Sequence, residues 1–580
     1  MSTIEEKRHT LAHLLAAAVR ELYSGAQNAI GPAVENGFYQ DFDLGSHKAT
    51  DEDLAKIEAK MREMLPNWHA FERREVSKDE ALKEFGWNPY KCELINEFSD
   101  SETQLTFYTV GGFLDLCRGG HAENPAADIA PDSFKLERIA GAYWRGDEKN
   151  KMLTRIYGLA FDSKAELDAY LAQIEEAKKR DHKKLGPELD LFVFSDLVGP
   201  GLPLFTPKGT LVRNLLDEFV WELRKPRGYQ KVEIPHITKK DLYEKSGHWD
   251  KFKDELFRIT TREGHEFAMK PMNCPHHTQI YARKQWSYRE LPQRYSNTTT
   301  CYRDEQSGEL SGLSRVRAFW QDDAHVFCRL GDVKSEFLKV WDIIHAFYPT
   351  FGFELKVRLS THDPEHMENY LGSIETWEKS VGMLKEIIAD KGIEAMDGVG
   401  EAAFYGPKLD FMAHDSIGRQ WQVATIQLDM LQPERFDLTC INEQGQKERI
   451  VMIHAAIMGS LERFMSILIE HTAGAFPLWL APVQVSVLPV GEAHQAYAQE
   501  ILNELESKGV RAEMLASDSL GKRIRETKMQ KVPCFIVVGD KEVADKTVTV
   551  ENNRAGDKQT VPLAEFITPM LEHIRTRANM

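Results

Sequence analysis

The stretch that decides the fold is Arg315-Val-Arg-Ala-Phe-Trp-Gln-Asp-Asp-Ala-His325, which comes shortly after Tyr302-Arg-Asp-Glu305. Its arginines are interleaved with Val, Phe and Trp, a pattern that favours a partly buried strand over a solvated charge cluster. Arginine is the side chain that binds phosphate through two parallel hydrogen bonds. The sequence contains no G-x-x-x-x-G-K phosphate loop. If a nucleotide binds, we therefore expect side chains of this stretch to hold it.

Short β-rich and helical segments surround this stretch. Residues 422–428 and 449–453 are predicted strands, and residues 333–348 are a predicted helix. Gly459-Ser-Leu-Glu-Arg-Phe464 follows the second strand and indicates a glycine turn at the start of a helix. The mixture predicts an α+β region between residues 189 and 478.

Composition places the chain among globular proteins of several domains. It has 580 residues, 42% of them hydrophobic and 28% charged, enough for roughly three to five domains with a core each. The formal charge of −17 is opposite to that of a non-specific nucleic-acid coat protein, so an RNA partner has to meet a local basic patch. Seven cysteines, none spaced as C-x-x-C, argue against a disulfide framework and a compact zinc ribbon.

No targeting or membrane-spanning segment is expected. The N-terminus lacks the apolar region of a signal peptide. The most apolar stretch, residues 476–490, contains three prolines and is too short to span a bilayer. These features predict a cytoplasmic protein with no membrane partner.

Two changes of pattern mark domain boundaries. Amphipathic helices are predicted over residues 3–23, 51–64 and 163–185. The last of them ends at Leu185-Gly-Pro187, a helix stop. A second boundary falls near Leu480-Ala-Pro482, beyond which strands and helices alternate over residues 483–538. Such alternation predicts an α/β sheet domain.

Candidate ligands gather in the N-terminal region. His9 and His13 share one face of the first predicted helix, and Cys117-Arg-Gly-Gly-His121 follows about a hundred residues later. The residue types match a zinc site. Because H-x-x-x-H is common on helices, two unrelated pairs remain an equal alternative.

Five segments carry a resemblance to a known family: Met269-Lys-Pro-Met-Asn-Cys-Pro275, the Arg303 segment, Gln321-Asp-Asp-Ala-His325, Phe404-Tyr-Gly-Pro-Lys408 and Gly459-Ser-Leu-Glu-Arg-Phe464. They resemble the class II aminoacyl-tRNA synthetases, and within them the threonyl-tRNA synthetases. Gly141-Ala-Tyr-Trp-Arg-Gly-Asp147 and Gly539-Asp-Lys-Glu-Val543 are similar to the same family. The resemblance covers essentially the whole chain, and its motifs are long, ordered and specific.

The resemblance implies a fold and an organisation. The fold is α+β and multidomain, with an editing domain and linker helix over residues 1–185, a class II catalytic domain with an antiparallel sheet over 186–479, and an α/β anticodon-binding domain over 480–580. The family forms homodimers that meet around Gly228–Pro235. Its bacterial members usually carry a ubiquitin-like domain ahead of the His9 helix, which we expect this chain to lack.

The resemblance also implies an activity and partners. The activity is that of a threonine–tRNA ligase, which activates L-threonine with ATP and transfers it to tRNA(Thr). Serine differs from threonine only by a methyl group worth about 1–3 kcal/mol, which is insufficient discrimination for translation. The family therefore also hydrolyses mischarged seryl-tRNA(Thr) at a second site.

The resemblance implies a catalytic zinc ion that is held by Cys274, His325 and His454. Three protein ligands leave zinc an open position, which threonine fills in this family with its amino and hydroxyl groups. A site that ligates a hydroxyl rejects valine by on the order of 10⁴-fold, whereas an apolar pocket separates the two poorly. Asp323 is expected to bind the substrate ammonium. Tyr405 and Gln427 are expected to shape the pocket, and Gln321 is expected to lie nearby.

ATP is expected to bind with Mg²⁺ between its phosphates. By the resemblance, Arg303 holds the α-phosphate and Arg463 the γ-phosphate. Glu305, Arg315 and Gln422 help to bind the nucleotide. In-line attack of the threonine carboxylate on the α-phosphorus needs no side-chain nucleophile, because the catalysis is mostly positioning and charge stabilisation.

The resemblance assigns the editing site to His9, His13, Cys117 and His121. Cys117 and His121 are expected near the mischarged ester. His9 and His13 are expected to orient water and the ribose hydroxyls, in a site without metal. Gly120 stands where the family usually has Pro and is expected to loosen this loop.

Further departures fall in the other two regions. His276 and Ala455 stand where Gly and Arg are usual, and are expected at the rim of the substrate pocket. Glu551 stands where an Arg usually reads an anticodon base. We expect Arg554 to carry this recognition, the alternative being Glu542 with the basic residues between 522 and 531.

Other functions fit less well. A prolyl or seryl synthetase does not share the Cys/His/His set as a whole. A non-catalytic RNA-binding regulator on this scaffold would be expected to lose Arg303 or Arg463, and both are present. A freestanding editing factor would end near residue 185.

Overall fold

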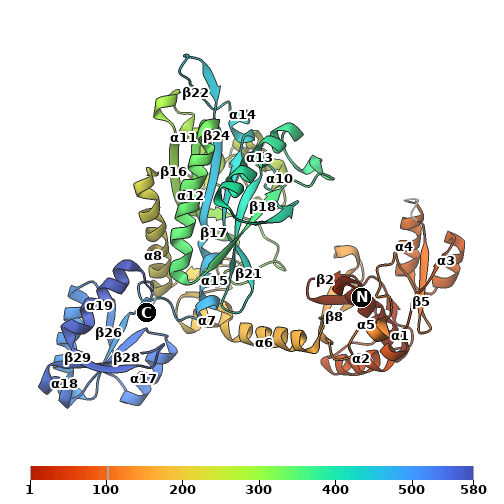
Figure 1. Cartoon of the computed structure of the whole chain (residues 1–580), viewed down its shortest axis with the longest axis horizontal. Helices are drawn as coiled ribbons and strands as arrows, with labels where there is room; N and C mark the ends of the chain where they lie inside the picture. Colours follow the sequence, from red (N-terminus) through yellow and green to blue (C-terminus); the bar gives the residue numbers. More distant parts are fainter. Residues whose placement is uncertain (1, 101–103, 579–580) are drawn as a thin grey trace. The chain divides into compact units, whose positions relative to one another are not determined.

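The computed structural model describes residues 2–100 and 104–578, and its contacts divide the chain into two compact units, Met1–Glu176 and Ala177–Met580 (Figure 1). The boundary lies inside α6 (Lys164–Arg180), the helix that joins them. No helix within the described residues is long and apolar enough to cross a bilayer.

The first unit is built around helix α1 (Ile4–Leu22), whose residues from Thr10 to Val19 are all buried. Thr3 and Glu6 form a capping box at its N-terminus, which satisfies amides that lack a partner inside the helix. The helix packs against α2 (Asp51–Met64) and strand β3 (Gly37–Asp43). Both predicted helices of this region are therefore confirmed.

Two antiparallel sheets complete this unit. The larger has the strand order β1-β3-β8-β7, with β2 paired to β3, and the smaller has the order β4-β5-β6. Their further strands are β1 (Gln27–Asn28), β2 (Ala33–Val34), β4 (Glu72–Glu75), β5 (Thr106–Val110), β6 (Phe113–Leu116), β7 (Phe134–Tyr143) and β8 (Met152–Ala160). The remaining helices are α3 (Lys78–Phe85), α4 (Pro89–Asp100) and α5 (Pro125–Asp128).

The helix predicted over residues 163–185 is wrong at its end. It is divided into α6 and α7 (His182–Glu188), with Asp181 between them. The Asp181 carboxylate accepts a hydrogen bond of 2.8 Å from the Lys183 amide and so starts a new helix. Gly186 and Pro187 lie inside α7, because a helix this short can accommodate a proline near its end.

The second unit holds an eight-stranded sheet in the order β11-β16-β17-β24-β21-β20-β18-β19. Its strands are β11 (Gln230–Lys231), β16 (Gln293–Tyr302), β17 (Ala318–Cys328), β18 (Glu354–Thr361), β19 (Ala395–Val399), β20 (Lys408–His414), β21 (Gln420–Asp429) and β24 (Val451–Ser460). All neighbours are antiparallel except at the two edges, where β11 and β19 run parallel to their partners. The antiparallel catalytic sheet implied by the resemblance is confirmed.

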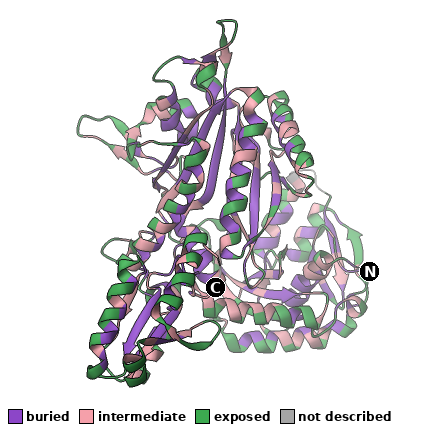
Figure 2. Ribbon diagram, turned by 60° about the vertical axis from the view of Figure 1, so that its left-hand side comes forward, coloured by how far each residue is buried: buried purple, intermediate pink, exposed green. Residues whose placement is uncertain are grey.

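Helices cover this sheet. Helix α12 (Val333–Phe347), predicted from the sequence, packs against β24, β21 and α8 (Pro207–Arg224) (Figure 1). Figure 2 shows that the central strands are buried along most of their length. The last strand, β24, leads directly into α15 (Leu461–Thr472). Gly459 has φ +66°, and the Ser460 hydroxyl accepts from the Arg463 amide, which confirms the predicted glycine turn and helix start.

Smaller elements surround the sheet. The helices are α9 (Lys240–Ser246), α10 (His248–Lys251), α11 (Cys274–Tyr281), α13 (Ile374–Lys391) and α14 (Leu431–Arg435). The strands are β9 (Phe192–Val193), β10 (Leu204–Phe205), β12 (Ile237–Lys239), β13 (Arg258–Thr260), β14 (Glu266–Met269), β15 (Trp286–Ser287), β22 (Thr439–Ile441) and β23 (Lys447–Arg449). The strand predicted over 449–453 is thus shared between β23 and the start of β24.

The C-terminal part of this unit has a sheet of its own, in the order β26-β25-β27-β28-β29. The strands are β25 (Val485–Pro489), β26 (Ala512–Met514), β27 (Cys534–Val538), β28 (Thr547–Asn552) and β29 (Lys558–Pro562). The helices are α16 (Gln495–Ser507), α17 (Leu520–Met529), α18 (Asp540–Asp545) and α19 (Leu563–Thr576). Strands β26, β25 and β27 are parallel, as the predicted alternation of strands and helices requires.

Candidate functional site

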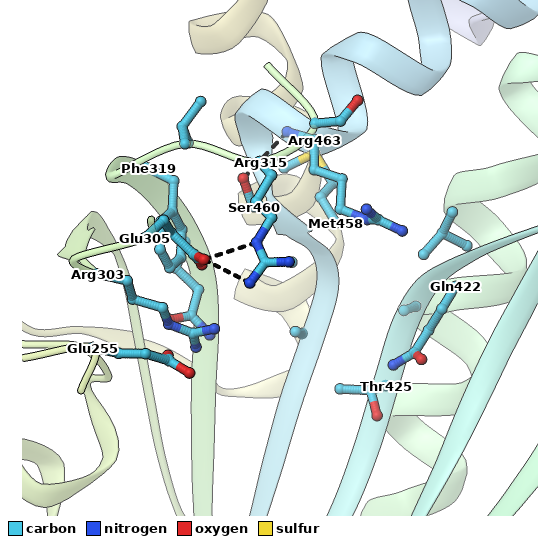
Figure 3. A pocket seen from close by; sticks show the side chains of 17 residues that line it. Glu255, Arg303, Glu305, Arg315, Phe319, Gln422, Thr425, Met458, Ser460 and Arg463 are labelled. Atoms are coloured by element: carbon cyan, nitrogen blue, oxygen red, sulfur yellow. Dashed lines mark hydrogen bonds and ion pairs between the residues drawn. The ribbon is translucent and has the colours of Figure 1, made fainter. Parts of the chain in front are cut away.

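A cavity of about 470 Å³ opens on the large sheet, a size typical of a small-molecule site. All five residues expected to bind ATP line it, namely Arg303, Glu305, Arg315, Gln422 and Arg463. Gln321 lines it as well. Figure 3 shows Arg303 and Glu305 on one side and Gln422 and Thr425 on the opposite side. The tertiary structure therefore brings together residues that are up to 160 positions apart in the sequence.

Two arginines of this cavity have no carboxylate partner among the described residues. Among the described residues, neither Arg303 nor Arg463 forms an ion pair with a carboxylate, and Nε of Arg303 is buried without a partner. Arg303 stacks against the Phe252 and Phe319 rings at 5.5 and 5.4 Å. Burial lowers the pKa of Arg463. Partly buried guanidinium groups without a carboxylate partner are suited to an anionic ligand such as a polyphosphate.

Arg315 behaves differently because it has a carboxylate partner. Its Nε and Nη2 atoms lie 2.7 and 2.6 Å from the same oxygen of Glu305, a pair drawn in Figure 3. This hydrogen bond raises the pKa of Arg315. The pair fixes the guanidinium in one orientation at the edge of the cavity.

Gln422 is held in place by Asp410, a residue that sequence reasoning missed. The fully buried Asp410 carboxylate accepts from Gln422 Nε2 at 2.9 Å and from the Thr425 hydroxyl at 2.7 Å. Its other oxygen is bound by Lys408 at 2.9 Å and by the Ser360 hydroxyl at 2.7 Å. The only sequence signal is a single carboxylate inside the apolar run from Leu409 to Ala413, where a charge has to be paired.

Cys274, His325 and His454 form a second, buried group. Cys274 is the first residue of α11, and the two histidines are direct cross-strand partners on β17 and β24. One ligand atom of each residue lies within 4.8 Å of the others, and His325 Nε2 is 3.1 Å from His454 Nδ1. A thiol and two imidazoles are the donor set that Zn²⁺ prefers. The donors present therefore fit the zinc ion that the family implies.

Neighbouring groups orient both imidazoles. Asp429 Oδ2 lies 2.8 Å from His454 Nε2, so that Nδ1 of this histidine faces the group. His277 Nδ1 lies 2.7 Å from His325 Nδ1, which leaves Nε2 of His325 on the same side. Carboxylates and other polar groups behind metal-binding histidines commonly fix their tautomer in this way. Neither Asp429 nor His277 was singled out from the sequence.

The residues expected to bind threonine lie next to this group. The Tyr405 ring stacks on His454 with centroids 4.8 Å apart, and its hydroxyl donates to Gln427 Oε1 at 2.6 Å. Asp323 is buried, accepts from Asn273 at 3.1 Å and lies 3.7 Å from His325. Burial raises the pKa of Asp323 to about 6, so a cationic partner would stabilise its charged form.

The four predicted editing residues converge in the first unit. Cys117 Sγ lies 3.4 Å from His9 Nε2 and 3.3 Å from His121 Nε2. His13 is buried beside them, and its Nδ1 atom lies 3.1 Å from Asp115. One ligand atom from each of the four lies within 4.8 Å of the others, so the two pairs that the sequence left open form one cluster.

Charges in this cluster favour a thiolate. Burial alone would raise the pKa of Cys117, but the interactions with His121, His13 and His9 outweigh it and lower the pKa to about 3. Burial likewise opposes the charged form of His13, yet Asp115 and Cys117 raise its pKa to about 9. At neutral pH the cluster therefore contains a thiolate beside an imidazolium.

Three residues behind the cluster were missed from the sequence. Asp115 Oδ1 lies 2.7 Å from Lys91 Nζ, and Asp115 Oδ2 accepts from Asn28 at 3.1 Å. All three are buried. Asp115 could have been found from its position two residues before Cys117, because side chains two positions apart face the same side of an extended chain. Lys91 and Asn28 come from distant segments and left no local signal.

The three departures from the family pattern in these two sites have different surroundings. Gly120 has φ +84°, which a proline cannot adopt, and its carbonyl lies 3.1 Å from His9 Nδ1. His276 and Ala455 are both buried. Among the described residues, the ring nitrogens of His276 have no hydrogen-bond partner.

The basic segment between residues 522 and 531 lies on α17 and the turn after it, and several of its side chains make contacts within the protein. Arg523 is buried and donates to the Pro489 and Leu515 carbonyls at 2.7 Å, so it is not part of an exposed patch. Lys528 forms an ion pair of 2.6 Å with Glu551. Arg554, the residue expected to read the anticodon, donates to the Ala475 carbonyl.

Comparisons with known proteins agree with this arrangement. Residues 257–472 match the family model of the tRNA synthetase class II core domain (G, H, P, S and T), and residues 484–573 match the anticodon binding domain. Residues 105–157 match the threonyl and alanyl tRNA synthetase second additional domain. The second segment of the editing cluster, which contains Cys117 and His121, lies within the last match.

Curated relatives match almost the whole chain. The threonine–tRNA ligase of Acetivibrio thermocellus is 48% identical over 576 residues, which cover 99% of this chain and 89% of the relative. The threonine–tRNA ligase of Phocaeicola vulgatus is 48% identical over 577 residues, covering 98% and 88%.

Solved structures agree. The RNA binding domain of threonyl-tRNA synthetase from Cryptosporidium parvum Iowa II has a TM-score of 0.64 at 36% identity and covers 68% of this chain and 98% of that one. A prolyl-tRNA synthetase from Giardia lamblia, at 17% identity and a TM-score of 0.57, shares the fold. With 48% identity along nearly its full length to threonine–tRNA ligases, the chain belongs to the threonine–tRNA ligase family.

Proposed function

We propose that this chain is itself a threonine–tRNA ligase, using ATP with Mg²⁺, L-threonine and tRNA(Thr) as substrates. The observation that carries the proposal is the placement of two sites on the same pair of strands. Strand β17 carries Gln321 in the nucleotide cavity and His325 in the Cys/His/His group. Strand β24 carries His454 and ends at Ser460, beside Arg463. An amino acid and a nucleotide bound there would meet along the strands.

Charge placement supports the activation of an amino acid by ATP. Arg303 and Arg463, which have no carboxylate partner among the described residues, would hold the α- and γ-phosphates. Glu305 orients Arg315, and Asp410 orients Gln422, so both are preorganised for the nucleotide. The threonine carboxylate then displaces pyrophosphate from the α-phosphorus. Fixed positive charge stabilises the developing negative charge without reorganisation during the reaction.

The Cys/His/His group would hold Zn²⁺ through Cys274, His325 and His454. When bound by three protein ligands, zinc supplies coordination positions that an amino and a hydroxyl group of the substrate can fill. Asp323 would bind the substrate ammonium, which explains why a carboxylate with a raised pKa lies in this pocket. Tyr405 and Gln427, joined by their hydrogen bond, would close the pocket around the side chain.

The first unit would hydrolyse seryl-tRNA(Thr) at the His9, His13, Cys117 and His121 cluster. The thiolate of Cys117 and the imidazolium of His13 would form a charge pair in this cluster. His121, whose pKa is lowered mainly by burial, stays neutral and can accept a proton from water. His9 would orient water or a ribose hydroxyl, with its other nitrogen held by the Gly120 carbonyl.

The organisation of the chain follows from these assignments. Residues 1–185 would carry editing, 186–479 amino-acid activation, and 480–580 anticodon binding. The enzyme would act in the cytoplasm as a homodimer with contacts around Gly228–Pro235. A monomer in sedimentation at micromolar concentration would contradict the dimer.

Pyrophosphate exchange tests the proposal directly. Wild-type protein should exchange pyrophosphate into ATP with threonine, weakly with serine and not with valine or proline. His325→Ala should abolish exchange and zinc content while leaving hydrolysis of supplied seryl-tRNA intact. Cys117→Ala should leave exchange and zinc content intact but abolish the hydrolysis, so that seryl-tRNA accumulates. Absence of zinc from active protein would refute the metal assignment, and equal loss of both activities in Cys117→Ala would make this cysteine structural.

A further inference from the structure

A bulge interrupts the pairing of β17 with β24 between the two substrate sites. Asp322 pairs with Gly459, and Ala324 pairs with Ala455. A single residue of β17, Asp323, therefore faces three residues of β24, Ala456–Met458. Bulges change the direction of side chains and leave backbone groups without ladder partners.

The unpaired amides of this bulge are bound by one carboxylate. The Ile457 and Met458 amides donate to Asp322 Oδ2 at 2.9 and 3.0 Å. The Tyr348 hydroxyl donates to the Ile457 carbonyl at 2.6 Å. Asp322 thus replaces the strand partners that β17 fails to supply.

The Asp322 carboxylate has 0% exposure, so its charge needs a partner. Arg224, the last residue of α8 and 1% exposed, donates to its other oxygen. The same guanidinium donates to the Ser296 hydroxyl at 3.0 Å and to the Ala455 carbonyl at 3.2 Å. One side chain therefore joins β16, β17 and β24 behind the bulge.

The pair lies on the side of the sheet away from the substrates. Because strand side chains alternate, Gln321, Asp323 and His325 face one side and Asp322 faces the other. In front of the bulge, Met458 and Gly459 line the nucleotide cavity, and Ser460 caps the helix that carries Arg463. Asp323 lies in the proposed threonine pocket.

We propose that Arg224 and Asp322 are positioning residues for amino-acid activation, which set the bulge so that Asp323, the carboxylate for the threonine ammonium, and the nucleotide wall from Met458 to Arg463 are aligned with each other. The inference rests on the proposed function. It explains why an ion pair that touches neither substrate is buried at the junction of three strands and a helix.

Asp322→Asn tests the proposal, because asparagine keeps the shape but removes the charge and one acceptor oxygen. In threonine-dependent pyrophosphate exchange, kcat/KM for ATP and for threonine should each fall at least tenfold. Zinc content and the hydrolysis of supplied seryl-tRNA should stay at the wild-type level. An unchanged kcat/KM for both substrates would overturn the proposal.

Glu336→Gln is the matched control for a purely structural effect. Glu336 is 2% exposed and forms a buried pair with Arg294 on β16, at 2.6 and 2.8 Å, but touches neither the bulge nor a cavity residue. It should lower the melting temperature as Asp322→Asn does while leaving kcat/KM within twofold. An equal kinetic loss in both variants would show that Asp322 acts only through stability.

Arg224→Lys decides the matter if Asp322→Asn does not fold. Lysine keeps the charge opposite Asp322 but cannot reach Ser296 and Ala455 together, so KM for ATP should rise at least fivefold in folded protein. Wild-type KM and kcat in this variant would refute the positioning role. Wild-type protein that shows no threonine-dependent exchange would instead refute the proposed function itself.

Discussion

Cys117 offers the sharpest test of the editing cluster, because its pKa is lowered to about 3. Above pH 5 the thiol is then fully ionised, and raising the pH adds no further nucleophile. An ordinary cysteine with a pKa of about 8.5 gains roughly 700-fold in thiolate between pH 5 and pH 8. The rate of alkylation of Cys117 by iodoacetamide should therefore change by less than about threefold over this range.

Peptide mass analysis separates the labelling of Cys117 from that of the other cysteines. Of the seven cysteines, only Cys92 and Cys117 are partly exposed, and the other five are buried. The rate for Cys117 should stay flat with pH, whereas the rate for free cysteine added to the same solution should rise steeply.

Asp115→Asn sharpens the result. Asp115 raises the pKa of His13, and the positive charge of His13 in turn lowers that of Cys117. The variant should therefore restore part of the pH dependence at Cys117 and leave Cys92 unchanged. A pH profile for Cys117 in the wild-type protein as steep as that of free cysteine would refute the thiolate assignment.

Three further predictions follow from the same contacts. Asp429→Asn removes the carboxylate behind His454 and should weaken zinc binding by about 10–100-fold, as measured by competition with a chelator; wild-type affinity would mean that this contact does not tune the metal. The pKa of His13 is raised from 6.5 to about 9, so its charge should stabilise the fold fully below pH 6.5 and lose this contribution as the pH rises towards 9; the difference in thermal unfolding between wild type and His13→Gln should shrink over that range. Arg554→Ala should weaken tRNA use by roughly 1–3 kcal/mol, the usual cost of losing one base contact, while threonine-dependent pyrophosphate exchange stays unchanged; unaffected aminoacylation of tRNA would show that the anticodon is read elsewhere.

Local patterns in the sequence were sufficient for several elements of the secondary structure. The helices α1, α2 and α12 and the alternating elements of the C-terminal sheet follow from periodicity and turn residues, which act within a few positions. The pattern failed at the end of α6, where a single capping aspartate divides the predicted helix into α6 and α7. Capping competes with periodicity on the same scale, so the pattern alone could not decide between one helix and two.

The sequence by itself also determined the candidate residues, because motifs such as Arg315–His325 carry side chains of a recognisable chemistry in a fixed order. Only the tertiary structure decided how these residues act. Cys274, His325 and His454 are separated by up to 180 positions, and they meet because β17 and β24 are neighbours in the sheet. The groups that orient them, such as Asp429, Asp410 and Asp115, left weak local signals or none. Their role depends on burial and on partners from distant segments, which are properties of the folded chain and of no single stretch of it.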